Sequence, residues 1–83
     1  MKATVLIVDD DAAIRNMVRN MLEPGGMRVR EAGNGNQALQ YFAEEMPDLV
    51  ILDLMMPTMS GFDVCSRMRE TDSHSRLPIL VLT

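Results

Sequence analysis

The sequence predicts an α/β fold in which a doubly wound parallel sheet carries helices on both faces. Short apolar runs recur along the 83-residue chain, and such runs are typical of strands buried on both faces of a parallel sheet. Between them lie longer segments whose apolar residues are spaced as on one face of a helix. The resulting β-α-β-α-β-α-β order, with connections long enough for helices, indicates parallel strands joined by right-handed crossovers.

The first strand and the first helix are predicted from the start of the chain. Thr4–Val8 is rich in β-branched residues and predicts a buried strand. Asp11 can cap the following helix, because its side chain can accept a hydrogen bond from a free amide of the first turn. The helix has an apolar stripe formed by Ile14, Met17, Val18, Met21 and Leu22. On the opposite side, Arg15 and Arg19 are interpreted as a solvated polar face without a binding role.

The second strand and helix follow. Residues 27–31 alternate apolar and charged side chains, which is typical of a half-exposed edge strand protected by its charges. A second helix is predicted by an apolar stripe of Ala38, Leu39, Phe42, Ala43 and Met46. Gly33, Gly35 and Ala38 also fit the G-x-G-x-x-A pattern of a dinucleotide-binding turn. We interpret this match as fortuitous, because that fingerprint follows a buried strand and residues 27–31 are charged.

The last helix and strand are predicted from the final third of the chain. Ser60 and Asp63 form a capping-box pattern at the start of a third helix. Its predicted inward-facing residues are Phe62, Cys65 and Met68. His74 lies in a polar segment and is interpreted as an exposed loop residue. Ile79–Leu82 is again fully apolar and predicts a fourth strand, directly before Thr83.

Carboxylates stand at the ends of two predicted strands. The apolar run 49–52 predicts a central strand that ends on Asp53, and the first strand ends on Asp9 and Asp10. Parallel neighbouring strands bring their carboxyl ends to one edge of a sheet, so these three side chains should converge there. Their repulsion would raise their pKa values or be relieved by a hard divalent cation such as Mg²⁺. Beside a metal ion, an aspartate can act as a nucleophile towards phosphorus.

These motifs resemble the receiver domain of two-component response regulators. The first strand ends in V-D-D-D, and the D-x-x-M-P-x-x-x-G pattern lies at Asp53, Met56, Pro57 and Gly61. The resemblance extends from Val5 to Thr83, and the combined motifs are far more specific than any one of them. It implies a flavodoxin-like fold of the chemotaxis-regulator type. Receivers continue through another helix, a fifth strand carrying a lysine and a last helix, so we expect residues 1–83 to be a receiver domain truncated after its fourth strand.

The resemblance also implies a phosphorelay function. Asp53 would accept a phosphoryl group from a histidine kinase or phosphotransfer protein, and the hydroxyl of Thr83 would contact that group. Asp10, Asp53 and the backbone carbonyl of Met55 would bind Mg²⁺ directly. Asp9 would contribute to the same metal site through water. The signal would pass to an effector or output domain, and the protein would be a phosphoacceptor that takes part in its own phosphorylation and dephosphorylation, not an enzyme.

Two alternative functions stay open at this point. A phosphatase of the haloacid dehalogenase type also uses a strand-end aspartate as nucleophile. It needs a second aspartate two positions later, where this chain has Met55, and this difference counts against it. The other alternative is a fragment with the receiver shape that serves as a structural or interaction module, because the lysine-bearing strand is not in the sequence.

Composition excludes several other classes. The net charge of −4 argues against direct nucleic-acid binding, which needs clustered Lys and Arg. The single cysteine, Cys65, rules out an internal disulfide and is interpreted as a small buried hydrophobe. Apolar runs are far shorter than the roughly 18 to 20 residues of a membrane span, and no signal-peptide pattern precedes the first strand. We therefore expect a cytoplasmic protein that does not enter the membrane.

The face of the sheet beneath the first helix is expected to be incompletely covered. One helix shields only part of such a face, and Ile79–Leu82 would be an apolar, uncharged edge strand that invites pairing with another chain. The aliphatic residues considered for exposure, according to which way each points, are Leu6, Val8, Val50, Leu52, Leu80 and Leu82. The sequence therefore predicts that the 83-residue chain self-associates.

Overall fold

The computed structural model describes residues 2–71 and 77–82, so the predictions for His74 and Thr83 fall outside the described residues. In the described part, strands and helices alternate as predicted. The elements are β1 (Thr4–Val8), α1 (Ala12–Leu22), the short 3-10 helix η1 (Glu23–Gly25), β2 (Arg28–Ala32), α2 (Gly35–Glu44), β3 (Leu49–Asp53), α3 (Gly61–Thr71) and β4 (Ile79–Leu82).

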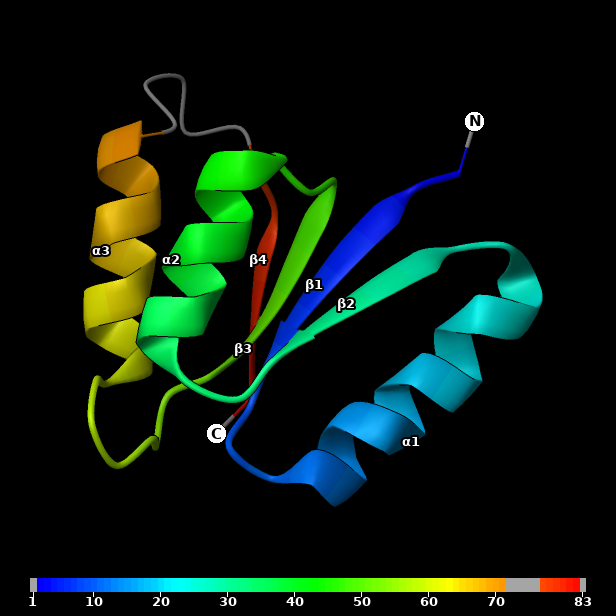
Figure 1. Cartoon of the computed structure of the whole chain (residues 1–83), viewed down its shortest axis with the longest axis horizontal. Coiled ribbons are helices and arrows are strands. Elements are labelled where there is room, and N and C mark those ends of the chain that lie inside the picture. Colours follow the sequence, from blue (N-terminus) through cyan, green and yellow to red (C-terminus); the bar gives the residue numbers. More distant parts are fainter. Residues whose placement is uncertain (1, 72–76, 83) are drawn as a thin grey trace.

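The described strands form one parallel sheet in the order β2-β1-β3-β4. Figure 1 shows α1 on one face of this sheet and α2 and α3 side by side on the other. This arrangement confirms the predicted doubly wound sheet. As expected from its alternating charges, β2 is an edge strand, whereas β3 pairs with both β1 and β4 in the interior of the sheet.

Two apolar clusters hold the helices on the sheet. The larger one, between the sheet and the α2–α3 pair, includes Leu6, Val8, Val50 and Leu52 from the strands and Ala38, Phe42, Val64 and Met68 from the helices. The smaller one, beneath α1, is built around Val5, Ile7, Val29 and Ile51. Successive side chains of a strand point to opposite faces, so β1 supplies both clusters.

The helix caps were predicted correctly, but one inward-facing residue was not. The Asp11 carboxylate accepts a hydrogen bond from the amide of Ala13 at 2.9 Å, and the Ser60 hydroxyl accepts one from the amide of Asp63 at 3.2 Å. Phe62, predicted to face the core, is 66% exposed. The buried stripe of α3 runs along Gly61, Val64 and Met68, and Phe62 lies off that stripe.

An apolar hollow of about 410 Å³ lies between α1 and strands β3 and β4. Its lining includes Met17 and Met21 from α1, Ile51 from β3, and Leu80 and Leu82 from β4. The apolar stripe of α1 was predicted correctly, but Met17 and Met21 remain 55% and 70% exposed. The face under α1 is therefore only partly covered in the described residues.

The identity of the side chains that stay exposed differs from part of the expectation. Leu6, Val8, Val50 and Leu52 are buried beneath α2 and α3, whereas Leu80 is 54% exposed on the α1 side. Leu80 differs from these four residues because of the register of the last strand. Leu80 pairs with Ile51, so it shares the face of Ile51 and not that of Val50. Within the described residues, no helix is long and apolar enough to cross a membrane.

Candidate functional site

The structure brings the predicted carboxylates together at the carboxyl edge of the sheet. Val8 and Leu52 are paired residues of the neighbouring parallel strands β1 and β3, so the residues that follow them emerge side by side. Asp9, Asp10 and Asp53 each offer a carboxylate oxygen, and these oxygens lie within 4.8 Å of one another. We call this group the acidic cluster.

Asp9 is the buried member of the acidic cluster, with 3% of its surface exposed. Its amide donates to the carbonyl of Ala32 at the end of β2 at 3.1 Å, and its Oδ1 accepts from the amide of Asp11 at 2.9 Å. Burial raises the pKa of the Asp9 carboxyl, and the charges of Asp53, Asp10 and Asp11 add to this effect, against the lowering effect of the hydrogen bond from the Asp11 amide. Several negative charges thus surround the Asp9 carboxylate, which has little contact with solvent.

Asp10 and Asp53 form the more accessible side of the cluster. Asp10 is exposed and Asp53 is half-buried. The Asp53 Oδ1 accepts a hydrogen bond from the amide of Met55 at 3.0 Å, so the loop after β3 folds back on the carboxylate. Met55 itself is 79% exposed at the start of this loop. The cluster therefore combines one buried carboxylate with two that a solute can approach.

Gly61 allows the loop between β3 and α3 to close tightly. Its amide donates to the carbonyl of Leu54 at 3.1 Å. A Cβ atom at this position would meet the carbonyl oxygen of Asp53 and would lie 2.6 Å from the Cα of Leu54. Both are backbone atoms that cannot move aside cheaply. Glycine is therefore required here, because the backbone at this position lies against the backbone of Asp53 and Leu54. This close contact fixes the path of the loop that follows Asp53.

Two arginines of α1 clamp this helix to the end of β2. Arg15 Nε donates to Glu31 Oε1 at 3.1 Å, and Arg19 Nε donates to Glu31 Oε2 at 2.7 Å. These hydrogen bonds hold the pKa of the Glu31 carboxyl below its ordinary range, and the bond from Arg19 has the largest effect. Partial burial opposes them. In addition, Arg15 Nη1 donates to the backbone carbonyl of Asp9 at 2.6 Å.

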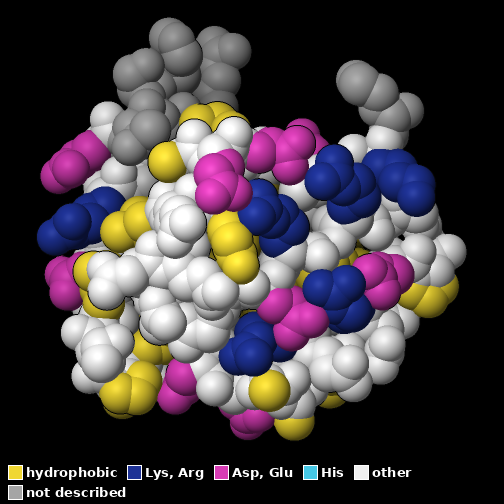
Figure 2. Space-filling model, viewed as in Figure 1, with side chains coloured by type: hydrophobic (Ala, Val, Ile, Leu, Met, Phe, Trp, Pro, Cys, Tyr) yellow, Lys and Arg dark blue, Asp and Glu magenta, His cyan; other side chains and the backbone are white. Residues whose placement is uncertain are grey.

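This clamp corrects the interpretation of Arg15 and Arg19 as a solvated face. The side chain of Arg15 is only 19% exposed and that of Arg19 is 31% exposed. Charged side chains of both signs lie interleaved on the face of the molecule seen in Figure 2, without a large basic patch. Sequence reasoning missed the clamp because Glu31, the shared partner, lies on a different element.

The acidic cluster fits a hard divalent cation. Two oxygens bound to one Mg²⁺ at about 2.1 Å can be at most about 4.2 Å apart, and a third carboxylate often contacts the ion through water. Oxygens spread over no more than 4.8 Å match such a set of direct and water-mediated ligands after small side-chain adjustments. The mutual repulsion of the carboxylates also favours a cation among them.

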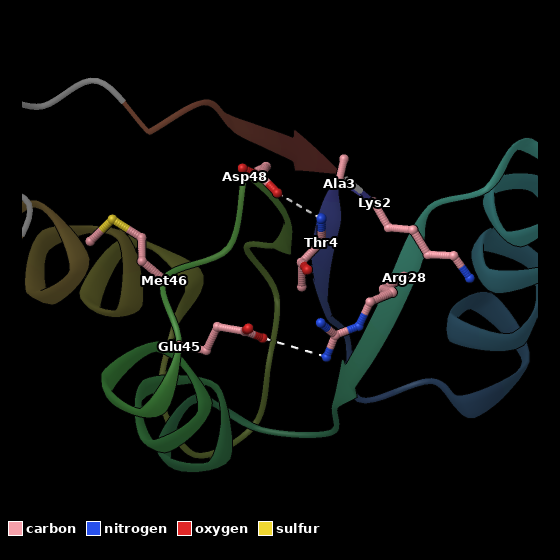
Figure 3. A pocket seen from close by; sticks show the side chains of 7 residues that line it. All are labelled: Lys2, Ala3, Thr4, Arg28, Glu45, Met46 and Asp48. Carbon is pink, nitrogen blue, oxygen red and sulfur yellow. Dashed lines mark hydrogen bonds and ion pairs between the residues drawn. The ribbon is translucent and has the colours of Figure 1, made fainter.

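A second hollow, of about 630 Å³, lies at the opposite end of the sheet (Figure 3). Arg28 and Glu45 face each other across it in an ion pair of 3.6 Å, and the Thr4 amide donates to the Asp48 carboxylate at 2.7 Å. None of the predicted site residues lines this hollow. Arg28, Glu45 and Asp48 thus have partners within the hollow, and the three convergent carboxylates of the described residues lie at the other end of the sheet.

Comparison with known sequences gives a consistent family. The profile of the family described as "Response regulator receiver domain" matches residues 5–83. Response regulator MprA of Mycolicibacterium vanbaalenii is 45% identical over 83 residues, which are the whole of this chain and 35% of that protein. The probable transcriptional regulator ycf27 of Guillardia theta is 46% identical over 82 residues, or 99% of this chain and 31% of that protein. The chain thus spans about a third of the length of these curated relatives.

Solved structures show the same fold. The chemotaxis protein CheY4 of Vibrio cholerae superimposes with a TM-score of 0.92 at 36% identity, covering 98% of this chain and 68% of that one. NtrX of Brucella abortus superimposes with a TM-score of 0.88 at 29% identity, covering 98% of this chain and 18% of that one. The strand order β2-β1-β3-β4 agrees with the flavodoxin-like order 2-1-3-4-5 over the strands described here.

Proposed function

This chain belongs to the family of response regulator receiver domains, and from that premise we propose that Asp53 is a phosphoacceptor in a two-component phosphorelay. The observation that carries the proposal is the convergence of Asp9, Asp10 and Asp53 at one edge of the sheet. The two accessible carboxylates lie beside a buried one, which is an arrangement suited to a metal-assisted transfer of a phosphoryl group. The 83 residues would then be part of a receiver domain that continues beyond them.

In the proposed reaction, a carboxylate oxygen of Asp53 attacks the phosphorus of a phosphohistidine on a histidine kinase or phosphotransfer protein. The P–O bond to Asp53 forms while the P–N bond to the histidine breaks, and the imidazole leaves with the electron pair and regains a proton from solvent. The chain supplies a nucleophile whose carboxylate is oriented by the Met55 amide. It acts as a phosphoacceptor that contributes to its own modification, not as an enzyme for other substrates.

We propose that Mg²⁺ is held directly by Asp10, Asp53 and the backbone carbonyl of Met55, with Asp9 contributing through water. When bound, the ion neutralises charge on the transferring phosphoryl group. Asp9 suits the indirect role because it is buried and its Oδ1 is already engaged by the Asp11 amide. A role for the Thr83 hydroxyl in contacting the phosphoryl group is part of the same proposal. Its support is that Leu82, the preceding residue, pairs with Asp53 in the sheet.

The phosphorylated site would be read by an effector or an output domain. MprA carries the name response regulator, ycf27 is named a probable transcriptional regulator, and both are about three times as long as this chain. These names support a regulatory output joined to the receiver or recruited by it. The cytoplasmic location expected from the sequence belongs to this proposal as well.

A small phosphodonor tests the assignment of the phosphoacceptor. We expect phosphoramidate and Mg²⁺ to add one phosphoryl group to the 83-residue chain, and peptide mass mapping to place it on Asp53. The chain should react slowly, because no lysine reaches the site to neutralise the added charge. Its single lysine, Lys2, precedes β1 at the opposite end of the sheet. Asp53→Asn should not be modified, whereas Asp63→Asn, outside the cluster, should react like the wild type. Phosphate found on Asp9 or Asp10 would refute the assignment.

We also propose that the 83-residue chain self-associates through the apolar hollow and the neighbouring edge of β4. In the described residues β4 pairs only with β3, and its Leu80 and Val81 are 54% and 40% exposed. An apolar edge strand without charges is a template for pairing with another chain. A second copy supplies an equally apolar surface, so the proposed partner is another molecule of this chain.

Sedimentation over a wide concentration range tests self-association. We expect the average mass of the wild type to rise with concentration, and Leu80→Lys to suppress this rise because it places a charge in the contact. Phe62→Lys is the matched control, since Phe62 is equally apolar and 66% exposed but lies on α3, away from the hollow. A wild type that stays monomeric at all concentrations would show that this face does not associate.

A further inference from the structure

Arg15 joins three parts of the fold beside the acidic cluster. It belongs to α1, its Nε donates to Glu31 near the end of β2 at 3.1 Å, and its Nη1 donates to the backbone carbonyl of Asp9 at 2.6 Å. The short distance to Asp9 and the 19% exposure of the Arg15 side chain indicate a fixed guanidinium group. The charged guanidinium group of Arg15 therefore donates a hydrogen bond to the peptide group that connects Asp9 to Asp10.

The orientation of that backbone decides where Asp10 projects. The carbonyl of Asp9 and the amide of Asp10 belong to one planar peptide group, so fixing the carbonyl fixes the direction in which Asp10 leaves it. The amide of Asp9 is already held by the carbonyl of Ala32 at 3.1 Å. Ala32 therefore holds the amide of Asp9 and Arg15 holds its carbonyl. Both contacts connect Asp9 to the end of β2, the second one through Glu31.

Arg19 provides an internal comparison for this role. It binds the other carboxylate oxygen of Glu31 at 2.7 Å and also donates to Glu23 and to the carbonyl of Val29. These hydrogen bonds attach α1 to β2 as those of Arg15 do, but they do not include the backbone of Asp9. If substitutions of the two arginines have different effects, the difference reports on the hydrogen bond from Arg15 to the Asp9 carbonyl.

We propose that Arg15 is a positioning residue for the metal-binding carboxylates, which it orients by holding the Asp9–Asp10 peptide group against β2. This inference rests on the proposed function, because it concerns the same acidic cluster. The positive charge of Arg15 by itself repels a divalent cation, so simple removal of charge should tighten Mg²⁺ binding. A positioning role has the opposite effect, and the two explanations therefore differ in sign.

The test uses Arg15→Met, which removes charge and donors, Arg15→Lys, which keeps the charge but not the two-sided guanidinium, and Arg19→Met as the matched control. Calorimetric titration with Mg²⁺ should show affinity reduced about tenfold in both Arg15 variants, the lower end of the range for groups that orient metal ligands. Arg19→Met should stay within about twofold of the wild type. Unchanged or tighter binding in Arg15→Met, or equal weakening in Arg19→Met, would overturn the inference.

A metal-free readout separates this inference from the proposed function. The amide of Asp11 donates to Asp9 Oδ1 at 2.9 Å, so its hydrogen exchange reports on the order of the turn. We expect exchange at Asp11 to be at least about tenfold faster in the Arg15 variants than in the wild type and in Arg19→Met. A wild type that does not bind Mg²⁺ would count against the proposed function alone. Unaltered Asp11 exchange in the Arg15 variants would count against the positioning role.

Discussion

Asp10→Ala and Asp53→Asn should each weaken Mg²⁺ binding by about 100-fold or more, measured by calorimetric titration of the 83-residue chain. Each change removes a charged oxygen from a set whose members lie within 4.8 Å. Loss of groups that merely orient metal ligands already costs about 10- to 100-fold in affinity, so loss of a direct ligand should cost at least as much. Since Mg²⁺ uses few protein carboxylates, the remaining ligands cannot compensate.

Asp11→Asn is the control for this titration. Asp11 is a neighbouring carboxylate outside the acidic cluster, and its side chain caps α1 through the amide of Ala13. Asparagine caps a helix about as well as aspartate does, so the fold should be kept while one nearby negative charge is lost. We expect only a few-fold weakening of Mg²⁺ binding. Equal affinity in the wild type, Asp10→Ala and Asp53→Asn would rule out the proposed metal site.

Gly61→Ala should destabilise the fold by about 2 to 3 kcal/mol and also weaken Mg²⁺ binding. The added Cβ would meet the carbonyl oxygen of Asp53 and lie 2.6 Å from the Cα of Leu54. Relief of these contacts requires the backbone of the loop to move, and the same loop presents Asp53 and Met55. Urea unfolding gives the free energy of unfolding, and Mg²⁺ titration of the folded variant gives the effect on the site.

Gly25→Ala is the matched control for steric bulk. A Cβ atom at Gly25 would meet nothing within 4 Å, and Gly25 has no positive φ angle. We expect its free energy of unfolding to stay within about 0.5 kcal/mol of the wild type. If Gly61→Ala were as stable as Gly25→Ala, the close approach at Gly61 would not constrain the loop.

The acidic cluster was predictable from the sequence because its assembly depends only on the direction and adjacency of two strands. Two apolar runs ending in carboxylates, joined by segments long enough for helical crossovers, must place Asp9 and Asp53 at the same edge once the strands are parallel neighbours. The caps were predictable for a similar reason, since Asp11 and Ser60 act on amides within three residues of themselves.

Features that depend on strand register, or on which side chain of another element lies opposite, were not predictable. The exposed side of β4 follows from the pairing of Leu80 with Ile51, and no local pattern fixes the register between strands so far apart in sequence. The clamp on Glu31 has the same origin, because a polar position on a helix does not reveal which strand lies opposite. Phe62 was misplaced because the stripe Gly61, Val64 and Met68 starts at a glycine, which carries no hydrophobic signal.

The central position of β1 has a consequence for folding kinetics. β1 pairs with β2 and also with β3, although its partner residues in β3 lie more than forty positions later in the chain. Closing such a loop costs conformational entropy before the contacts between β1 and β3 can stabilise the chain, so parallel sheets of this kind fold slowly. During synthesis on the ribosome, β1, α1 and β2 can associate early, but the acidic cluster cannot assemble until Asp53 has left the exit tunnel. The site of the proposed phosphoryl acceptance is therefore completed late in the folding of this chain, after the inner strands have paired.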